Sequence, residues 1–175
     1  KLESLGYVHS GEGKYSDVYT NPDNNIAVKV SKRDDPCWES FAELVRGPGR
    51  GNPYFPRVAG VQTVKSRHGT YFLAFMENLS PYLSADNTRL TRWIDSAYDS
   101  LEYGNRQIED YWEGYEEGNI PGARPVVAEL IDRDLIDALE ILSEKAPTGC
   151  FNDLHEGNFM ERADEHLVIV DPWWD

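Results

Sequence analysis

A polar loop near the end of the chain carries the residues best suited to chemistry. Asp153 and Asn158 lie five positions apart in the segment 152–158, and Asp171 follows the apolar run 167–170. A carboxylate can accept a hydroxyl proton or orient a nucleophile, and an amide oxygen is a hard ligand that suits Mg²⁺. We expect Asp153 to be catalytic and Asn158 and Asp171 to bind metal, although Asn, Asp and Gly also build ordinary turns.

A second chemical signal is the lysine in Ala27-Val28-Lys29-Val30. A buried ammonium group is costly without a partner, so Lys29 either faces water from an edge strand or pairs with a carboxylate and a ligand. The functional interpretation places it against the phosphates of a nucleotide. Glu39 and Glu43 lie four positions apart and would share one face of the following helix. We expect Glu43, which lies deeper in that helix, to be the partner.

The third signal is the glycine-rich segment Gly11-Glu12-Gly13 between two β-rich runs. Glycine allows backbone N–H groups to approach phosphate oxygens closely. Taken alone, however, such a segment is more often a simple hairpin.

The elements that must position these residues fall into two halves. Strands are predicted in the first half by β-rich runs bounded by turn residues, at 5–8, 18–20, 26–30, 58–65 and 71–77. Asp35-Pro36 begins a helix over 36–46, whose apolar face contains Phe41, Leu44 and Val45. The first half is therefore expected to be a small antiparallel sheet with one helix.

The second half is expected to be mainly helical. An apolar stripe at helical spacing runs from Thr91 to Tyr115, and a second helix is predicted over 126–145. The inward residues of that second helix are Val127, Leu130, Ile131, Leu135, Leu139 and Leu142. The fold class is α+β, with an N-terminal lobe at 1–78 and a reduced helical lobe at 79–175.

The charge is strongly acidic and unevenly distributed. Seventeen basic and 31 acidic residues give −14, with +2 in residues 1–70 and −16 in residues 71–175. Such a surface repels phosphate backbones, so nucleic acids and anionic membranes are poor partners. The charge either serves solubility alone or attracts a basic partner or a cation, and it could also imitate a nucleic acid.

Cys37 and Cys150 lie far apart, with neither the spacing of metal ligands nor that of a disulfide framework. We expect both to be packing residues in a protein of the reducing cytoplasm. No apolar run approaches the roughly 20 residues of a membrane helix.

Taken in order, these signals resemble the protein-kinase-like superfamily: glycine loop, strand lysine, helix glutamate, Asp-x₄-Asn loop and strand-end aspartate. The resemblance spans about residues 5–173 and is closest to the early serine/threonine protein kinases of T7-like bacteriophages. The matching segments are Gly11 to Tyr19, Val28-Lys29-Val30, Gly47 to Val58, Asp153 to Asn158 and Asp171-Pro172. Ser16 stands at the third glycine position, and Phe151-Asn152 replaces the usual His-Arg.

The resemblance implies a two-lobe fold and ATP/Mg²⁺-dependent phosphorylation of host proteins on Ser or Thr in the cytoplasm of an infected bacterium, with autophosphorylation. By position, the ATP-binding residues would be Gly11, Gly13, Ser16, Val18, Lys29 and Glu43. Asp153 would be the catalytic base or the group that orients the hydroxyl, and Lys29 and Asn158 would be the other catalytic residues. Asn158 and Asp171 would hold Mg²⁺.

Two alternatives stay open. One is an acidic binding protein on a kinase scaffold that inhibits a host enzyme or defence complex. The other is a small-molecule phosphotransferase, which the Asp-Leu-His-x-Gly-Asn motif at 153–158 supports. The acidic stretch 95–118 is a candidate dock for basic peptides, and His155 is expected to hydrogen-bond backbone rather than bind metal.

Overall fold

The computed structural model describes residues 2–31, 35–104 and 130–174 and, within them, every side chain except those of residues 96–104. The chain is a mixed α+β protein. The strands of its large sheet are β1 (Val8–Glu12), β2 (Ser16–Asn21), β3 (Ile26–Ser31), β4 (Val58–Ser66) and β5 (Gly69–Glu77). The α-helices of the described ranges are α1 (Pro36–Arg46), α2 (Ala85–Gly104) and α4 (Arg133–Lys145). Four short strands follow, β6 (Phe151–Asn152), β7 (Phe159–Glu161), β8 (Leu167–Ile169) and β9 (Trp173–Trp174).

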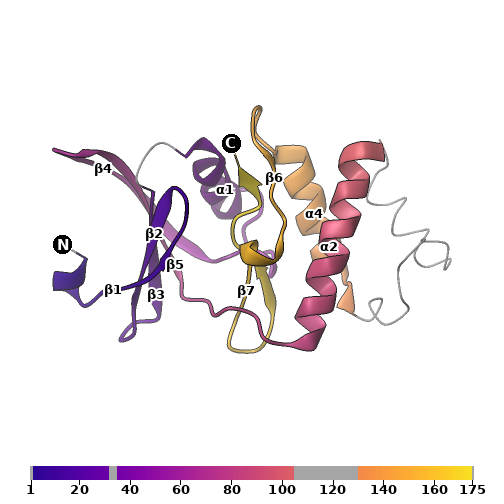
Figure 1. The fold of residues 1–175 in the computed structure, drawn as a ribbon, viewed down its shortest axis with the longest axis horizontal. Coiled ribbons are helices and arrows are strands. Elements are labelled where there is room, and N and C mark those ends of the chain that lie inside the picture. The colour runs from indigo at the N-terminus through magenta and orange to yellow at the C-terminus, as the bar shows by residue number, and fades with distance from the viewer. Residues whose placement is uncertain (1, 32–34, 105–129, 175) are drawn as a thin grey trace.

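Figure 1 shows the large sheet at one end of the molecule and α2 and α4 at the other, with α1 and the short C-terminal strands between them. The sheet is antiparallel with the strand order β1-β2-β3-β5-β4, so β3 is its central strand. Lys29 on β3 is flanked by Val18 on β2 and Ala74 on β5. The expected small antiparallel sheet is therefore confirmed, and Lys29 lies at its centre rather than on an edge.

The start of the sheet differs from the prediction. Glu3–Leu5 form a turn of 3₁₀-helix that ends at Gly6, whose φ of 83° favours glycine. The first strand accordingly begins at Val8, and it continues through Gly11 to Glu12. The turn of the first hairpin therefore follows Glu12 instead of including Gly11. It is closed by a hydrogen bond from Gly13 N–H to the Ser16 carbonyl at 2.7 Å.

Helix α1 matches its prediction because both ends are specified locally. The Asp35 side chain accepts a hydrogen bond from Trp38 N at 3.0 Å, and Pro36 occupies the first turn, where no N–H is needed. Phe41, Leu44 and Val45 are buried as expected. They join one continuous apolar core that also includes side chains of β3, β5, α2, α4 and β8.

The helices of the second half differ in their limits. Helix α2 begins at Ala85, six residues before the predicted stripe, and the stripe beyond 104 lies outside the described residues. Helix α4 begins at Arg133 rather than at 126, because the Asp132 side chain caps it by accepting from Leu135 N at 2.9 Å. Leu130 and Ile131 thus precede the helix.

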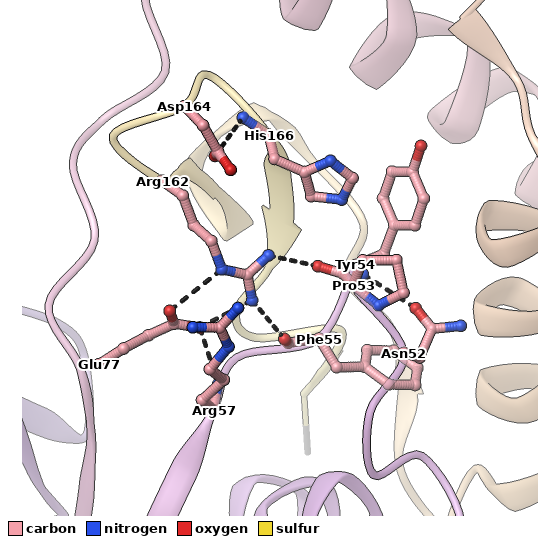
Figure 2. Close-up of polar contacts among 9 residues, drawn as sticks. All are labelled: Asn52, Pro53, Tyr54, Phe55, Arg57, Glu77, Arg162, Asp164 and His166. Atoms are coloured by element: carbon pink, nitrogen blue, oxygen red, sulfur yellow. Dashed lines mark hydrogen bonds and ion pairs between the residues drawn. The ribbon is translucent and has the colours of Figure 1, made fainter.

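A buried ion pair ties the C-terminal strands to the sheet (Figure 2). Arg162 follows β7, and its guanidinium donates to both carboxylate oxygens of Glu77, at 3.0 and 2.7 Å, at the end of β5. The same group donates to the backbone carbonyls of Pro53 and Phe55. Burial raises the pKa of Glu77, but the hydrogen bonds from Arg162 and from Arg57 N and the charge of Arg162 outweigh it, leaving that pKa below its ordinary value.

The prediction for the cysteines is wrong. Cys37, at the start of α1, and Cys150, just before β6, form a disulfide across 113 positions of sequence. The sequence does not predict this disulfide, because the two cysteines meet only when α1 packs against the C-terminal strands. The cysteine argument for a reducing compartment therefore fails. No helix in the described ranges is both long and apolar enough to cross a membrane.

Candidate functional site

Lys29 is the charged residue most deeply enclosed by the sheet. The residue is 8% exposed, and its Nζ donates to Asp171 Oδ2 at 2.7 Å. The same nitrogen lies 3.9 Å from the centroid of the Trp38 ring on α1, which is close enough for a cation–π contact. The cost of burying the ammonium is thus offset by a carboxylate and an aromatic face. Lys29 and Asp171 were expected as separate members of one site, and this hydrogen bond joins them across 142 positions of sequence.

The expected pairing of Lys29 with Glu43 is wrong. Glu43 bonds instead to Arg46 at 3.3 Å, one turn further along α1, and its side chain is 64% exposed. Glu43 projects outward because the inner face of α1 is occupied by apolar side chains and by Trp38, which covers Lys29. The position of Glu43 along the helix therefore does not indicate which way its side chain points.

The loop between β6 and β7 holds Asp153 and Asn158 together. Asn158 Nδ2 donates to Asp153 O at 2.7 Å and to Asp153 Oδ2 at 2.9 Å. Since the amide nitrogen is turned toward Asp153, the amide oxygen is directed away from it and can accept other contacts. The loop is specified locally, because residues 156–158 form a single 3₁₀ turn.

His155 organises this loop, as expected, through the backbone. Its Nδ1 accepts from Gly157 N at 3.0 Å, and its Nε2 lies 3.5 Å from Asp153 Oδ1. A Cβ at Gly157 would lie 2.8 Å from the His155 ring, so a larger residue there would force that ring to shift. Glycine, histidine and asparagine of the motif therefore form one interlocked unit around Asp153.

Backbone hydrogen bonds fix Asp171 relative to the loop. Val170 N donates to the Asn158 carbonyl at 2.9 Å, and Asp153 N donates to the Pro172 carbonyl at 2.8 Å. These two bonds hold the segments on either side of Asp171 against the segment 153–158. The three predicted polar residues consequently converge from two segments of the chain that are separated by β7 and β8.

A cleft of about 450 Å³ lies where the hairpin, this loop and the C-terminal strands meet. Its lining includes Gly13 and Ser16 from the hairpin, together with Asp153, Asn158 and Asp171. The predicted residues Gly11 and Val18 do not line it, because they face each other in the β1–β2 ladder. The cleft therefore joins the tip of the hairpin, rather than its stem, to the polar loop.

Sequence reasoning missed several residues of the cleft. They are Lys14, Tyr15, Asp35, His155, Trp173 and Trp174. Asp35 carried a signal only as a helix start, and Trp173 is 4% exposed with its ring 6.0 Å from that of Phe41. Lys14 adds an exposed positive charge at the hairpin tip, where its Nζ lies 4.4 Å from the centroid of the Tyr15 ring.

The chemistry of the cleft fits Mg²⁺ bound together with phosphates better than a metal held by protein alone. The described residues contain no group of three or more His, Cys, Asp or Glu able to hold a metal ion. Asn158 and Asp171 supply oxygen ligands in one cleft, and Mg²⁺ is commonly bound through one or two such groups plus phosphate and water.

No protein-family model matches the chain, and no curated protein shows significant similarity to it.

Proposed function

We propose that the protein is an ATP- and Mg²⁺-dependent protein kinase that phosphorylates Ser or Thr hydroxyls. The observation that carries the proposal is the convergence of Lys29, Asp171, Asp153 and Asn158, with Lys29 Nζ 2.7 Å from Asp171 Oδ2, beside the glycine hairpin. Two carboxylates and an amide oxygen around a cleft, with a buried cation bonded to one of the carboxylates, suit the handling of phosphates and a hydroxyl. Figure 1 places the large sheet at one end of the molecule and α2 and α4 at the other, which agrees with the proposed two-lobe arrangement.

Each residue has a distinct role in this proposal. Lys29 binds the α- and β-phosphates, and the backbone at Gly13 covers them. Asp153 accepts the proton of the acceptor hydroxyl as its oxygen attacks the γ-phosphorus. The bond from that phosphorus to the bridging oxygen breaks, and ADP leaves. Mg²⁺ held by Asn158 and Asp171 would screen the negative charge of the phosphates.

The positions of the loop residues support the role of Asp153. Its side chain is one-third exposed, so an acceptor hydroxyl can reach it, while Asn158 and His155 restrict its orientation. Preorganisation of this kind lowers the cost of aligning the reacting groups. Host proteins of an infected bacterium are the substrates that the proposal assigns to the enzyme.

The proposal is tested by following labelled γ-phosphate from ATP in the presence of Mg²⁺. The acceptors to compare are the protein itself, a generic basic protein, a bacterial lysate and an aminoglycoside. We expect label on Ser or Thr of protein acceptors, with none in Asp153→Asn. Transfer to the aminoglycoside alone would instead identify a small-molecule phosphotransferase.

A binding protein built on the same scaffold is the second candidate. The net charge of −16 in residues 71–175 favours it, because such a surface attracts basic partners. The acidic residues Glu109, Asp110, Glu113, Glu116 and Glu117, proposed as part of that surface, lie outside the described residues. Inhibition of a partner that persists in Asp153→Ala would favour this candidate over the kinase.

A further inference from the structure

A second pocket, of about 590 Å³, lies apart from the candidate site. It is formed by the C-terminal end of α1, the loop at 49–57 and the start of β4, and it shares no lining residue with the cleft. Four arginines line it, Arg46, Arg50, Arg57 and Arg162, and no Asp or Glu does. Such a concentration of positive charge is unusual in a chain with a net charge of −14.

The four guanidinium groups are not equally neutralised. Arg162 is paired with buried Glu77, and Arg46 bonds to exposed Glu43 at 3.3 Å. The guanidinium groups of Arg50 and Arg57 have no hydrogen bond or ion pair with any residue in the described ranges. Counting Glu43 and Glu77, the pocket keeps an excess of two positive charges.

The arrangement of the free cations favours a compact anion. Arg57 lies beside the Arg162–Glu77 pair, close enough for its charge to help lower the Glu77 pKa (Figure 2). Arg162 is held rigidly by Glu77 and two backbone carbonyls, so it gives the pocket a fixed wall. Arginine forks match the geometry of phosphate oxygens, and a dianion would relieve the repulsion among these side chains.

We propose that this arginine pocket binds a phosphate group, with Arg50 and Arg57 as its principal ligands. The phosphate is carried either by a phosphorylated side chain of a protein or by free inorganic phosphate, since both present the same dianion. The assignment does not depend on phosphoryl transfer in the cleft, because the two sites have separate linings.

Arginine footprinting of the intact protein tests the proposal directly. Phenylglyoxal modifies accessible guanidinium groups, and mass spectrometry of peptides reports each arginine separately. With phosphate or a phosphoserine peptide at ten times its Kd, mass action leaves about a tenth of the pockets free, so modification of Arg50 and Arg57 slows about tenfold. Exposed Arg67, in the β4–β5 turn, is the internal control and keeps its rate.

The two sources of phosphate are distinguished by which ligand protects Arg50 and Arg57 from phenylglyoxal. Protection by the phosphoserine peptide alone means that the phosphate is protein-borne, and protection by inorganic phosphate at similar concentration means that the free ion suffices. Unchanged rates at Arg50 and Arg57 with both ligands would overturn the proposal. Equal protection of Arg67, or by the unphosphorylated peptide, would overturn it as well.

A matched pair of variants provides an independent measurement. Arg50→Gln/Arg57→Gln should weaken binding of whichever ligand protects by about tenfold or more, because two charge-assisted contacts are lost. Arg67→Gln should bind as the wild type does. Equal affinities of the double variant and the wild type would contradict the assignment, and transfer of γ-phosphate is measured separately to keep this result distinct from the kinase proposal.

Discussion

At the scale of single residues, the proposed role of Lys29 is to bind the phosphates of the nucleotide. Its ammonium is enclosed by Asp171 and Trp38, so it is held in place before any ligand arrives. Lys29→Met preserves much of the apolar stem while removing the charge. Since hydrogen bonds to charged groups contribute roughly 1.5–3 kcal/mol, we expect ATP affinity to fall about 10- to 100-fold, as measured by calorimetry. Unchanged affinity in a folded variant would separate Lys29 from nucleotide binding.

Asn158 combines two tasks that can be separated by substitution. Its nitrogen orients Asp153 through two hydrogen bonds, and its oxygen is the proposed metal ligand. Asn158→Ala should raise the Mg²⁺ concentration for half-maximal activity by about tenfold or more. Asn158→Asp keeps an oxygen ligand but loses the donor, so its defect should lie mainly in turnover. An identical Mg²⁺ dependence in all three proteins would contradict the metal role.

At the scale of elements, the disulfide joins α1 to the strand that leads into the Asp153 loop. Closing a loop of this length restricts the unfolded chain and is worth about 3–5 kcal/mol. We expect Cys37→Ser/Cys150→Ser to lose stability of that size in urea unfolding. Reductant should destabilise the wild type similarly and leave the double variant unchanged. A wild-type midpoint that does not move when both thiols are shown to be free would refute this.

The Glu77–Arg162 pair is the second link between the sheet and the C-terminal strands. Removing one partner of a fully buried pair costs about 3–5 kcal/mol. The side chains of Arg162 and Glu77 are 12% and 15% exposed, so Glu77→Gln should lower the free energy of unfolding at pH 7 by an amount near or below the lower end of that range. Exposed Glu144, which pairs with its neighbour Lys145, provides the control, and Glu144→Gln should change stability little.

This stabilisation should depend on pH in a defined direction. The folded pKa of Glu77 is lowered from 4.5, so the stabilisation is complete above that value and is lost as the pH falls through the lower folded pKa. The difference in unfolding free energy between wild type and Glu77→Gln should therefore shrink in acid. A difference that stays constant down to pH 2 would show that Glu77 does not carry it.

The elements could be predicted wherever local chemistry specifies them. Asp35-Pro36 fixes the start of α1, and the turn residues at 21–25 fix the β2–β3 hairpin, where Asp23 N donates to Asn21 Oδ1. The start of α4 was placed too early because the apolar pattern continues before it, although the cap at Asp132 determines the boundary. The spacing of apolar residues alone does not distinguish a helix from apolar residues just before it, such as Leu130 and Ile131.

At the scale of the whole molecule, the types and order of residues predict which polar residues come together better than they predict the partner of each one. Lys29, Asp153, Asn158 and Asp171 do converge, as the order of motifs indicated. Glu43 and the cysteines were misassigned because their partners depend on how α1 is rotated and where it lies against distant strands. Such tertiary choices are absent from local sequence, which also gave no signal for the Arg162 network or the arginine pocket.

Two separate places in the molecule, the cleft and the arginine pocket, are the proposed sites for phosphate. Lys14 lines the cleft, and Lys29 pairs with Asp171, a residue that lines it. Arg50 and Arg57 line the arginine pocket. The rest of the chain is strongly acidic, which favours small or protein-borne phosphates over nucleic acid at these sites. An enzyme with this layout would transfer phosphate at one site and recognise it at the other.

The central claim is that Asp153 performs chemistry on a bound nucleotide, and one paired measurement tests it. Binding of Mg²⁺·ATP and transfer of γ-phosphate are measured on the same samples of wild type and Asp153→Asn. We predict similar affinities, with transfer reduced about 10²- to 10⁴-fold in the variant, as expected for loss of a general base. Equal transfer by both proteins, or no transfer by folded wild type that binds Mg²⁺·ATP, would contradict the account.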